Sequence, residues 1–293
     1  MEYKVFNSSD TNVKKFVFES KDIAVEVVLY RYNSYKERTV ICCSTQSGCP
    51  VGCAFCGTGR FFVRNLTASE IIEQIETVLQ HIDCDTKEIR KFQLMFMSMG
   101  EPFLNYKELK TAIERLNVMY PNAQLLVSTS APKNITENFD DFIELSNRIK
   151  NVGIQFSVHE STDEQRKKLI PTATTELHEI GMLGEKWAAA TWRYPFFNYC
   201  VHTGNSTKEN VKQLLEHFNP NVWQCTLSVI CEKDNTMKAS IESQLDIIER
   251  FSKMMIDAGY SLRVFNPAGQ DDIGGGCGQL WYFQEWLKSI YKV

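Results

Sequence analysis

The sequence lacks the features that place a protein in or across a membrane. Its first residues, MEYKVFNSSD, show no basic segment followed by an apolar one. No apolar run approaches the roughly 18 residues that span a bilayer. We therefore expect a cytoplasmic protein with no membrane partner. No internal repeat, low-complexity tract or linker interrupts the 293 residues, a length that suits one large α/β domain or two smaller ones.

The chain also lacks a strong excess of charge of either sign. Lys and Arg total 32 against 36 Asp and Glu, which gives a formal net charge of -4. This balance does not indicate a general binder of polyanions. It does not exclude one either, because a local basic patch is enough to hold phosphates.

Cysteine, by contrast, is abundant and unevenly distributed. Five of the ten cysteines lie in CCSTQSGCPVGCAFCGTG, residues 42–59. Cys49, Cys53 and Cys56 have C-x3-C-x2-C spacing, and Cys42 lies seven residues upstream of the first. In a reducing compartment, clustered cysteines are more often metal ligands or catalytic groups than disulfide partners.

Short apolar segments alternate with longer amphipathic ones along most of the chain. Segments of strand length cover residues 38–43, 91–97, 123–130, 152–159, 195–202, 222–230 and 260–265. Helical patterns follow the capping-box sequence TASE at Thr67–Glu70 and cover residues 105–120, 206–218 and 241–259. Strands separated by helices predict a parallel α/β sheet that carries its function at the carboxyl ends of the strands. About six such units predict a partial or full TIM-like barrel.

The first 37 residues have a different pattern. Residues 14–20 and 23–32 read as strands with no helix between them. We therefore expect a small β extension over residues 1–37, followed by a barrel core over residues 38–293.

The cysteine loop follows the first predicted core strand, at the functional end of the barrel. Cys49, Cys53 and Cys56 are one ligand short of a closed four-cysteine site, so they would leave one iron of a four-iron cluster open to a substrate. The alternative that the spacing allows is a zinc knuckle, with Cys42, Cys43 or a distant His as the fourth ligand.

Further motifs accompany this loop, namely MSMGEPFLN, VSTSAP, SVHESTDEQRKKLIPT and DDIGGGCGQL. Together with the loop they resemble the RlmN/Cfr family of radical S-adenosylmethionine (SAM) enzymes, which methylate adenine carbons in RNA. The resemblance runs from about Arg38 to Leu280. The three-cysteine loop marks the radical-SAM superfamily as a whole, whereas GGGCGQL together with Cys42 is specific to this branch.

The resemblance implies a partial (β/α)6 barrel of the radical-SAM type and two cofactors. Cys49, Cys53 and Cys56 would hold a 4Fe-4S cluster, and Gly100 and Glu101 resemble the pair that binds the amino end of SAM. Further SAM contacts are implied at Ser128 or Ser130 and at Ser157, Val158 and His159. Singly, these matches also fit ordinary turns and structural histidines. Their order at successive strand ends favours a cofactor site.

The resemblance also implies a reaction. Cys277 matches the residue that accepts a methyl group from SAM, and Cys42 matches the partner that resolves the covalent adduct with the base. Cys42 is assigned over Cys43 on family spacing, because only one of two adjacent strand residues can face the site. An electron donor such as flavodoxin or ferredoxin is implied as a partner. The remaining cysteines are expected to be packing residues: Cys84, Cys200, Cys225 and Cys231.

The sequence departs from the family pattern where the substrate would bind. Family members usually carry a separate amino-terminal helical domain, whereas we expect at most the β extension here. The family carboxylate before the first core strand has Glu37 or Tyr32 as its counterpart. A family asparagine that contacts SAM aligns with Cys231, with Asn235 nearby. These differences leave the radical chemistry unchanged and bear on the substrate.

RNA, either rRNA or tRNA, is the substrate that the resemblance implies. Phosphate contacts are predicted for Arg60, Arg64, Arg166, Lys167 and Lys168, although QRKKL also reads as a solvated helix face. Trp187, Trp192 and Tyr194 would either stack on a base or belong to the core. Two other functions stay open: a radical-SAM reaction on a nucleotide or other small molecule, and a zinc or redox-sensing module.

Overall fold

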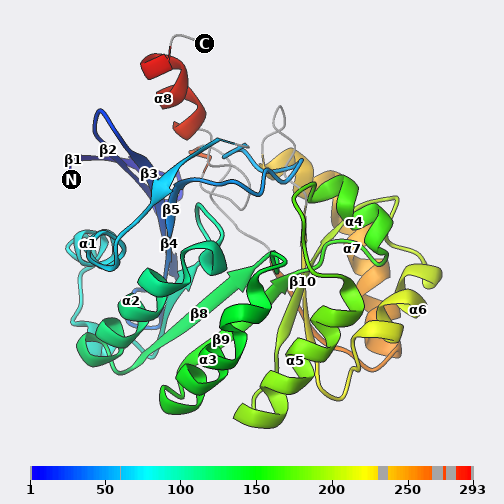
Figure 1. Cartoon of the computed structure of the whole chain (residues 1–293). Helices are drawn as coiled ribbons and strands as arrows, with labels where there is room; N and C mark the ends of the chain where they lie inside the picture. The colour runs from blue at the N-terminus through cyan, green and yellow to red at the C-terminus, as the bar shows by residue number, and fades with distance from the viewer. Residues whose placement is uncertain (1, 60, 230–236, 266–272, 275–281, 292–293) are drawn as a thin grey trace.

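The computed structural model describes residues 2–59, 61–229, 237–265, 273–274 and 282–291 (Figure 1). Its centre is a single large sheet with the strand order β1-β2-β3-β4-β7-β8-β9-β10-β11-β12. From β4 onward every neighbouring pair is parallel. These strands are β4 (Arg38–Cys43), β7 (Lys91–Phe96), β8 (Ala123–Thr129), β9 (Val152–Ser157), β10 (Phe196–Val201), β11 (Gln224–Val229) and β12 (Ser261–Phe265).

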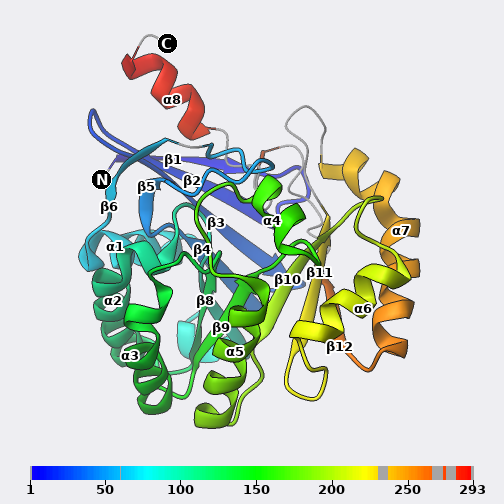
Figure 2. The ribbon, with the colours of Figure 1, turned by 45° about the vertical axis from the view of Figure 1, so that its right-hand side comes forward.

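Helices connect the successive parallel strands and lie along one face of the sheet (Figures 1 and 2). They are α1 (Ala68–Leu79), α2 (Tyr106–Met119), α3 (Ile135–Arg148), α4 (Asp163–Leu169), α5 (Leu177–Thr191), α6 (Lys208–His217) and α7 (Met237–Asp257). The shorter elements are the hairpin β5 (Gln46–Gly48) and β6 (Phe62–Asn65), the 3-10 turns η1 (Thr86–Glu88) and η2 (Pro102–Asn105), and the final helix α8 (Tyr282–Tyr291). Six strand–helix units followed by a last strand confirm the predicted partial (β/α)6 architecture.

The predicted strands and capping box are confirmed in detail. Each predicted core strand is present, with its ends within two residues of the expected positions. At the start of α1, the Thr67 hydroxyl accepts a hydrogen bond from the Glu70 N–H at 3.2 Å, and the Glu70 carboxylate accepts from the Thr67 N–H at 2.8 Å. This pair fixes where the helix begins, directly after the cysteine hairpin.

The amino-terminal β extension continues the central sheet. Strands β2 (Val13–Glu19) and β3 (Ala24–Tyr32) match the predicted segments, and β3 pairs antiparallel with β4. A further strand, β1 (Glu2–Asn7), lies at the edge and pairs with β2. The sequence analysis did not predict it, and most of its side chains are exposed. The division of the chain after residue 37 stays a prediction.

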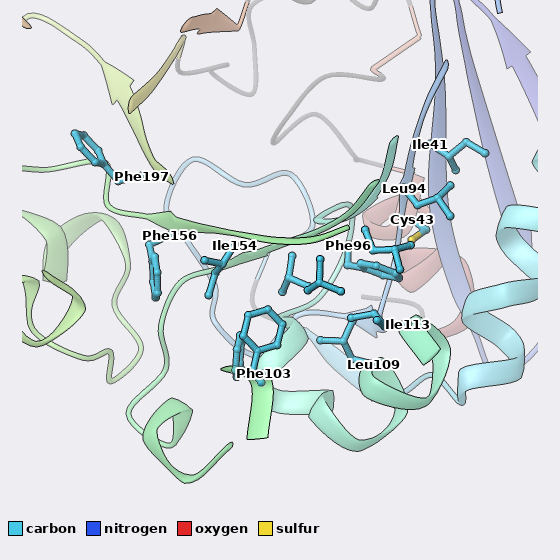
Figure 3. Packing of buried hydrophobic residues seen from close by; sticks show 14 of the residues in the cluster. Ile41, Cys43, Leu94, Phe96, Phe103, Leu109, Ile113, Ile154, Phe156 and Phe197 are labelled. Atoms are coloured by element: carbon cyan, nitrogen blue, oxygen red, sulfur yellow. The ribbon is translucent and has the colours of Figure 1, made fainter. Parts of the chain in front are cut away.

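The core fills the space between the sheet and the helices. In Figure 3, Leu94 and Phe96 of β7 lie beside Leu109 and Ile113 of α2, and all four side chains are buried. Alternation along each strand sends the intervening side chains to the concave side of the sheet, where the site is found. Among the described residues, no helix is long and apolar enough to cross a membrane.

Candidate active site

A cavity of ≈ 350 Å³ opens at the carboxyl ends of the parallel strands. Because these ends meet at one edge of the sheet, segments far apart in the sequence contribute to it. The predicted site residues that line it are Cys42, Cys49, Cys53, Cys56, Gly100, Glu101, Ser128, Ser130, Ser157 and His159. The structure therefore brings together almost all of the predicted cofactor residues within the part of the chain that it describes.

The loop that carries Cys49, Cys53 and Cys56 is fixed by backbone contacts to residues 169–172. The Ala54 N–H donates to the Leu169 carbonyl at 2.8 Å, and the Thr172 hydroxyl donates to the Val51 carbonyl at 2.5 Å. The LIPT segment after α4 thus positions the cysteine loop.

The three loop cysteines carry free, half-buried thiols. Burial raises the pKa of Cys49 to about 12, raises that of Cys53 well above its usual value and raises that of Cys56. These thiols therefore need a cation to become thiolates, and a metal centre supplies that charge.

A polynuclear cluster fits this arrangement better than a single zinc ion. In a 4Fe-4S cluster each thiolate binds a different iron, so the sulfurs need not converge on one point. The described residues contain no group of three or more His, Cys, Asp or Glu side chains able to hold one metal ion. Cys43, a candidate fourth zinc ligand, is fully buried in the hydrophobic core.

Glu101 lies on the cavity wall, and its carboxylate accepts four hydrogen bonds. It is 3% exposed, and its carboxylate accepts hydrogen bonds from the Phe103 N–H, the Thr129 hydroxyl, and both the N–H and the hydroxyl of Ser130. Burial raises the pKa of Glu101, and these four donors oppose that rise. The result is a fixed, desolvated carboxylate that suits an ammonium group.

Gly100 allows this placement. Its φ is +98°, and a Cβ at this position would lie 2.6 Å from Cβ of Gln46. A side chain is therefore excluded by backbone conformation and by space. The Gln46 side-chain oxygen accepts the Glu101 N–H at 2.8 Å, which ties the turn to the cysteine hairpin.

The phosphate contact predicted for Arg166 is wrong. Its side chain is only 1% exposed, and its guanidinium donates to the carbonyls of Ser130, Ser157 and Thr175 and to the Thr174 hydroxyl. It satisfies carbonyls at the ends of β8 and β9 and so stabilises the cavity wall. Lys167 and Lys168, on the same helix, are exposed as predicted for a solvated face.

His159 adopts a left-handed conformation with φ +63° and is 4% exposed. Burial, with the Arg166 charge, lowers the pKa of His159 to about 3, so the ring is neutral. Its Nδ1 is buried and has no hydrogen-bond partner among the described residues. A polar ligand in the cavity would satisfy that atom. The neighbouring Val158 side chain packs in the core, so it does not reach the cavity.

Cys42 and Cys43 face opposite sides of β4. Cys42 lines the cavity, whereas the Cys43 thiol lies in the core and donates to the Met95 carbonyl at 3.5 Å. Of the two counterparts for the family carboxylate, Tyr32 lines the cavity. Glu37 is 42% exposed and pairs with Arg90, away from the cavity.

The remaining predicted residues fall into four groups. Trp187 is 1% exposed and belongs to the core, which confirms the core alternative for this residue, whereas Trp192 and Tyr194 are exposed. Arg64 pairs with Glu70. Cys200 and Cys225 are buried and Cys84 packs against the core, as predicted. Four candidates lie outside the described residues: Arg60, Cys231, Asn235 and Cys277.

Sequence reasoning missed several polar residues on the concave face. Gln155, Asn198, Thr226, Ser228 and Arg263 line the cavity, and the Ser228 hydroxyl donates to the Asn198 side-chain oxygen at 2.9 Å. Their signal was available, because polar residues at alternate positions of an otherwise apolar strand mark a face turned away from the core.

The β extension holds both described segments that flank residues 275–281. Lys15 and Glu26 form a buried ion pair at 3.2 Å. The Lys15 ammonium also donates to the Gly274 carbonyl at 3.5 Å, and the Glu26 carboxylate accepts the Phe283 N–H at 3.1 Å. Trp286 of α8 donates to the Ser20 carbonyl at 3.1 Å.

Comparisons with known proteins agree with this geometry. The Radical SAM superfamily profile matches residues 43–179. A "Probable dual-specificity RNA methyltransferase RlmN" from Thermus thermophilus is 32% identical over 76% of the chain, which spans only 58% of that relative's length. The protein of the same name from Koribacter versatilis is 30% identical, with 83% of the chain and 69% of the relative covered.

Two solved structures share the fold. A radical SAM methyltransferase from Sphaerobacter thermophilus has a TM-score of 0.77 at 24% identity and covers 94% of this chain and 79% of its own. SuiB of Streptococcus suis bound to S-adenosylmethionine has a TM-score of 0.57 at 11% identity, with 81% and 53% covered. Both likenesses concern the fold.

Proposed function

Because the chain belongs to the RlmN family of the radical SAM superfamily, which implies a 4Fe-4S cluster and SAM, we propose that it methylates an sp2 carbon of adenine in RNA. The methyl group would pass through an S-methylcysteine at Cys277. The observation that carries this proposal is the position of Cys42, which shares one cavity with the three loop cysteines and Glu101.

The cofactor residues have distinct roles in this proposal. Cys49, Cys53 and Cys56 bind the cluster, and the buried carboxylate of Glu101 holds the ammonium group of SAM. His159, whose ring is neutral and whose Nδ1 has no partner in the described part of the chain, and the serines at the strand ends provide further polar contacts. When bound, the cluster and SAM supply the methyl group and the organic radical that activates it.

The two remaining cysteines act on the substrate. Cys277 carries the methyl carbon, which loses one hydrogen atom to the organic radical, forms a bond to the adenine carbon and leaves the base tethered as a thioether. The Cys42 thiolate removes the proton from that adenine carbon and passes it to solvent. The Cys42 sulfur then bonds to the Cys277 sulfur as the sulfur–carbon bond breaks; the released carbon takes up a proton to become the methyl group, and the one electron that is set free would pass to the cluster. Each turnover therefore ends with oxidised cysteines that must be reduced.

RNA is the proposed substrate, and a flavodoxin or ferredoxin is the proposed electron donor. The support for RNA is the printed name of the relatives together with the specific GGGCGQL and Cys42 pattern. On the described surface, Lys167 and Lys168 are the predicted phosphate contacts that stay exposed.

Three variants test the proposal under anaerobic conditions with SAM, reductant and cellular RNA. Cys277→Ala should still cleave SAM, yet form neither methylated adenine nor an adduct, because the carbon carrier is absent. Cys42→Ala should accumulate RNA attached at Cys277, which mass spectrometry would detect as a modified peptide. Cys43→Ala is the matched control and should turn over, since its side chain faces the core.

Two outcomes would contradict the proposal. Methylation of adenine by Cys277→Ala would remove the S-methylcysteine route. Absence of any adduct in Cys42→Ala with every RNA tested would favour a nucleotide or small-molecule substrate for the same radical chemistry.

A further inference from the structure

A second cavity, of ≈ 440 Å³, lies at the amino-terminal ends of the same parallel strands. It shares five lining residues with the first cavity: Met95, Met97, Ser128, Gln155 and Arg263. The two cavities therefore adjoin on the concave side of the sheet, and the candidate active site described above lies at its carboxyl end.

The lining of this second cavity is strongly cationic. Lys91, Lys150, Arg193 and Arg263 face it, and none of its lining residues is Asp or Glu. The whole chain nonetheless has a net charge of -4. Within the described part of the chain, none of these four cations forms an ion pair.

A fifth cation lies beside the cavity. In the parallel register of β4 and β7, Arg38 is aligned with Lys91. The Arg38 Nε donates to the side-chain oxygen of Gln93, a lining residue, at 3.1 Å. On the facing edge strand, the Arg263 Nε donates to the Thr226 hydroxyl at 2.8 Å. These bonds orient both guanidinium groups, and a terminal nitrogen of Arg263 also donates to the Gln155 side-chain oxygen at 3.4 Å.

Such a cluster of like charges costs free energy in the absence of an anion, because the charges repel one another in a partly desolvated site. The same repulsion disfavours the protonated forms of these groups. Burial and then the charges of Arg38 and Arg263 lower the pKa of Lys91, and burial and then Arg38 lower the pKa of Arg263. A bound polyanionic group would reverse this cost.

The mouth of the cavity carries exposed aromatic rings. Trp192 ends α5 with a left-handed φ of +59° and is 92% exposed, and Tyr194 is 56% exposed. Both line the cavity. An exposed ring beside a cationic pocket is the combination that binds a base together with its phosphate.

We propose that this amino-terminal cavity binds the phosphate of a nucleotide, with Lys91, Arg263 and Arg38 around the phosphate and Trp192 against the base. The phosphate belongs either to a free nucleotide or to an RNA strand. The site adjoins the SAM cavity, because Arg38 and Arg263 also line that cavity, and the proposal does not depend on the reaction proposed above.

Calorimetric titration of the intact protein with inorganic phosphate, AMP and a short single-stranded RNA tests this site. We expect AMP to bind and to quench tryptophan fluorescence, and phosphate to compete with it. Lys91→Gln should weaken the binding of AMP and of phosphate by about tenfold each, equivalent to ~1.4 kcal/mol. Trp192→Ala should weaken the binding of AMP and leave the binding of phosphate unchanged. Lys91 and Trp192 are exposed, so both variants should fold.

The controls separate this cavity from the SAM site. Lys253→Gln removes an exposed cation on α7 and should leave AMP binding unchanged. Glu101→Gln should also leave it unchanged, because Glu101 lines only the other cavity. If RNA displaces AMP, the phosphate that the cavity binds belongs to an RNA strand. If RNA does not displace AMP, the ligand is a free nucleotide. Undetectable binding of AMP and phosphate, or equal binding by a Lys91→Gln/Arg263→Gln variant, would overturn the proposal.

Discussion

Ser130 donates two hydrogen bonds to one carboxylate oxygen of Glu101: its N–H donates to Oε2 at 2.7 Å, and its hydroxyl donates to the same atom at 2.8 Å. Two segments that follow different strands, β7 and β8, are thereby joined at the wall of the SAM cavity. The acid is consequently both a ligand-facing group and a structural one.

Substitution of Glu101 should reveal both roles. Glu101→Ala leaves buried donors at Phe103, Thr129 and Ser130 unsatisfied, each at a cost of about 1–3 kcal/mol. We expect a clear loss of unfolding free energy in urea and weak SAM binding. Glu101→Gln keeps one acceptor oxygen, so it should be more stable than the Ala variant and still bind SAM weakly, since the negative charge is gone. The iron content of both variants should stay near that of the wild type. Loss of iron in both variants would mean that Glu101 supports the cysteine loop and does not bind SAM.

Substitution of any loop cysteine should abolish the cluster. Cys49→Ala, Cys53→Ala and Cys56→Ala each remove one thiolate, so iron content, visible absorbance and reductive SAM cleavage should fall together in anaerobically purified protein. Cys84→Ala, at a half-buried position outside the cavity, is the control and should keep all three signals. SAM cleavage retained by all three loop variants would disprove the assignment.

The buried pair of Lys15 and Glu26 should be sensitive to removal of one partner. Lys15→Met leaves the carboxylate of Glu26, which is fully buried, without its countercharge, at a cost of about 3–5 kcal/mol in unfolding free energy. Lys15→Met/Glu26→Gln should recover most of this loss, because the neutral amide still accepts the Phe283 N–H. Lys4→Met breaks an exposed pair with Glu19 and should change stability little. A double variant no more stable than Lys15→Met would show that charge burial is not the cause.

The capping box should make stability depend on pH below neutrality. Hydrogen bonds from Arg64 and Thr67 to the ionised carboxylate lower the pKa of Glu70 from 4.5 to about 2. Folding therefore favours the ionised form, and its contribution is present above pH 4.5 and is lost as the pH falls through about 2.

Glu70→Gln should accordingly lower stability at pH 7 and show a shallower further loss in this acid range. Glu76→Gln, an exposed change on the same helix, should keep the wild-type slope when unfolding free energy is measured against pH. Equal slopes for the wild type and Glu70→Gln would contradict the assignment.

The structure departs from the sequence prediction where a role depends on distant partners. QRKKL reads as a basic surface, yet Arg166 turns inward because four oxygen atoms from separate segments accept its hydrogen bonds. For the aromatic residues of this region the sequence left stacking and burial open, and tertiary packing decided that Trp187 is buried and Trp192 exposed. The edge strand β1, in which Tyr3, Val5 and Phe6 are the apolar residues, was not predicted, and its pairing with β2 determines it.

Local spacing by itself determined much of this protein. The order of strands and helices, the capping box at Thr67, the three-cysteine loop and the Gly100–Glu101 turn all depend on residues near one another in the chain, so the sequence predicts them. The tertiary structure alone decided which groups share a cavity. The register of β4 with β7 and the curvature of the sheet turn Cys42 toward the cluster loop and bring Arg38, Lys91 and Arg263 together. These residues come from β4, β7 and the edge strand β12, which are far apart in the sequence, so no local sequence pattern predicts that they meet.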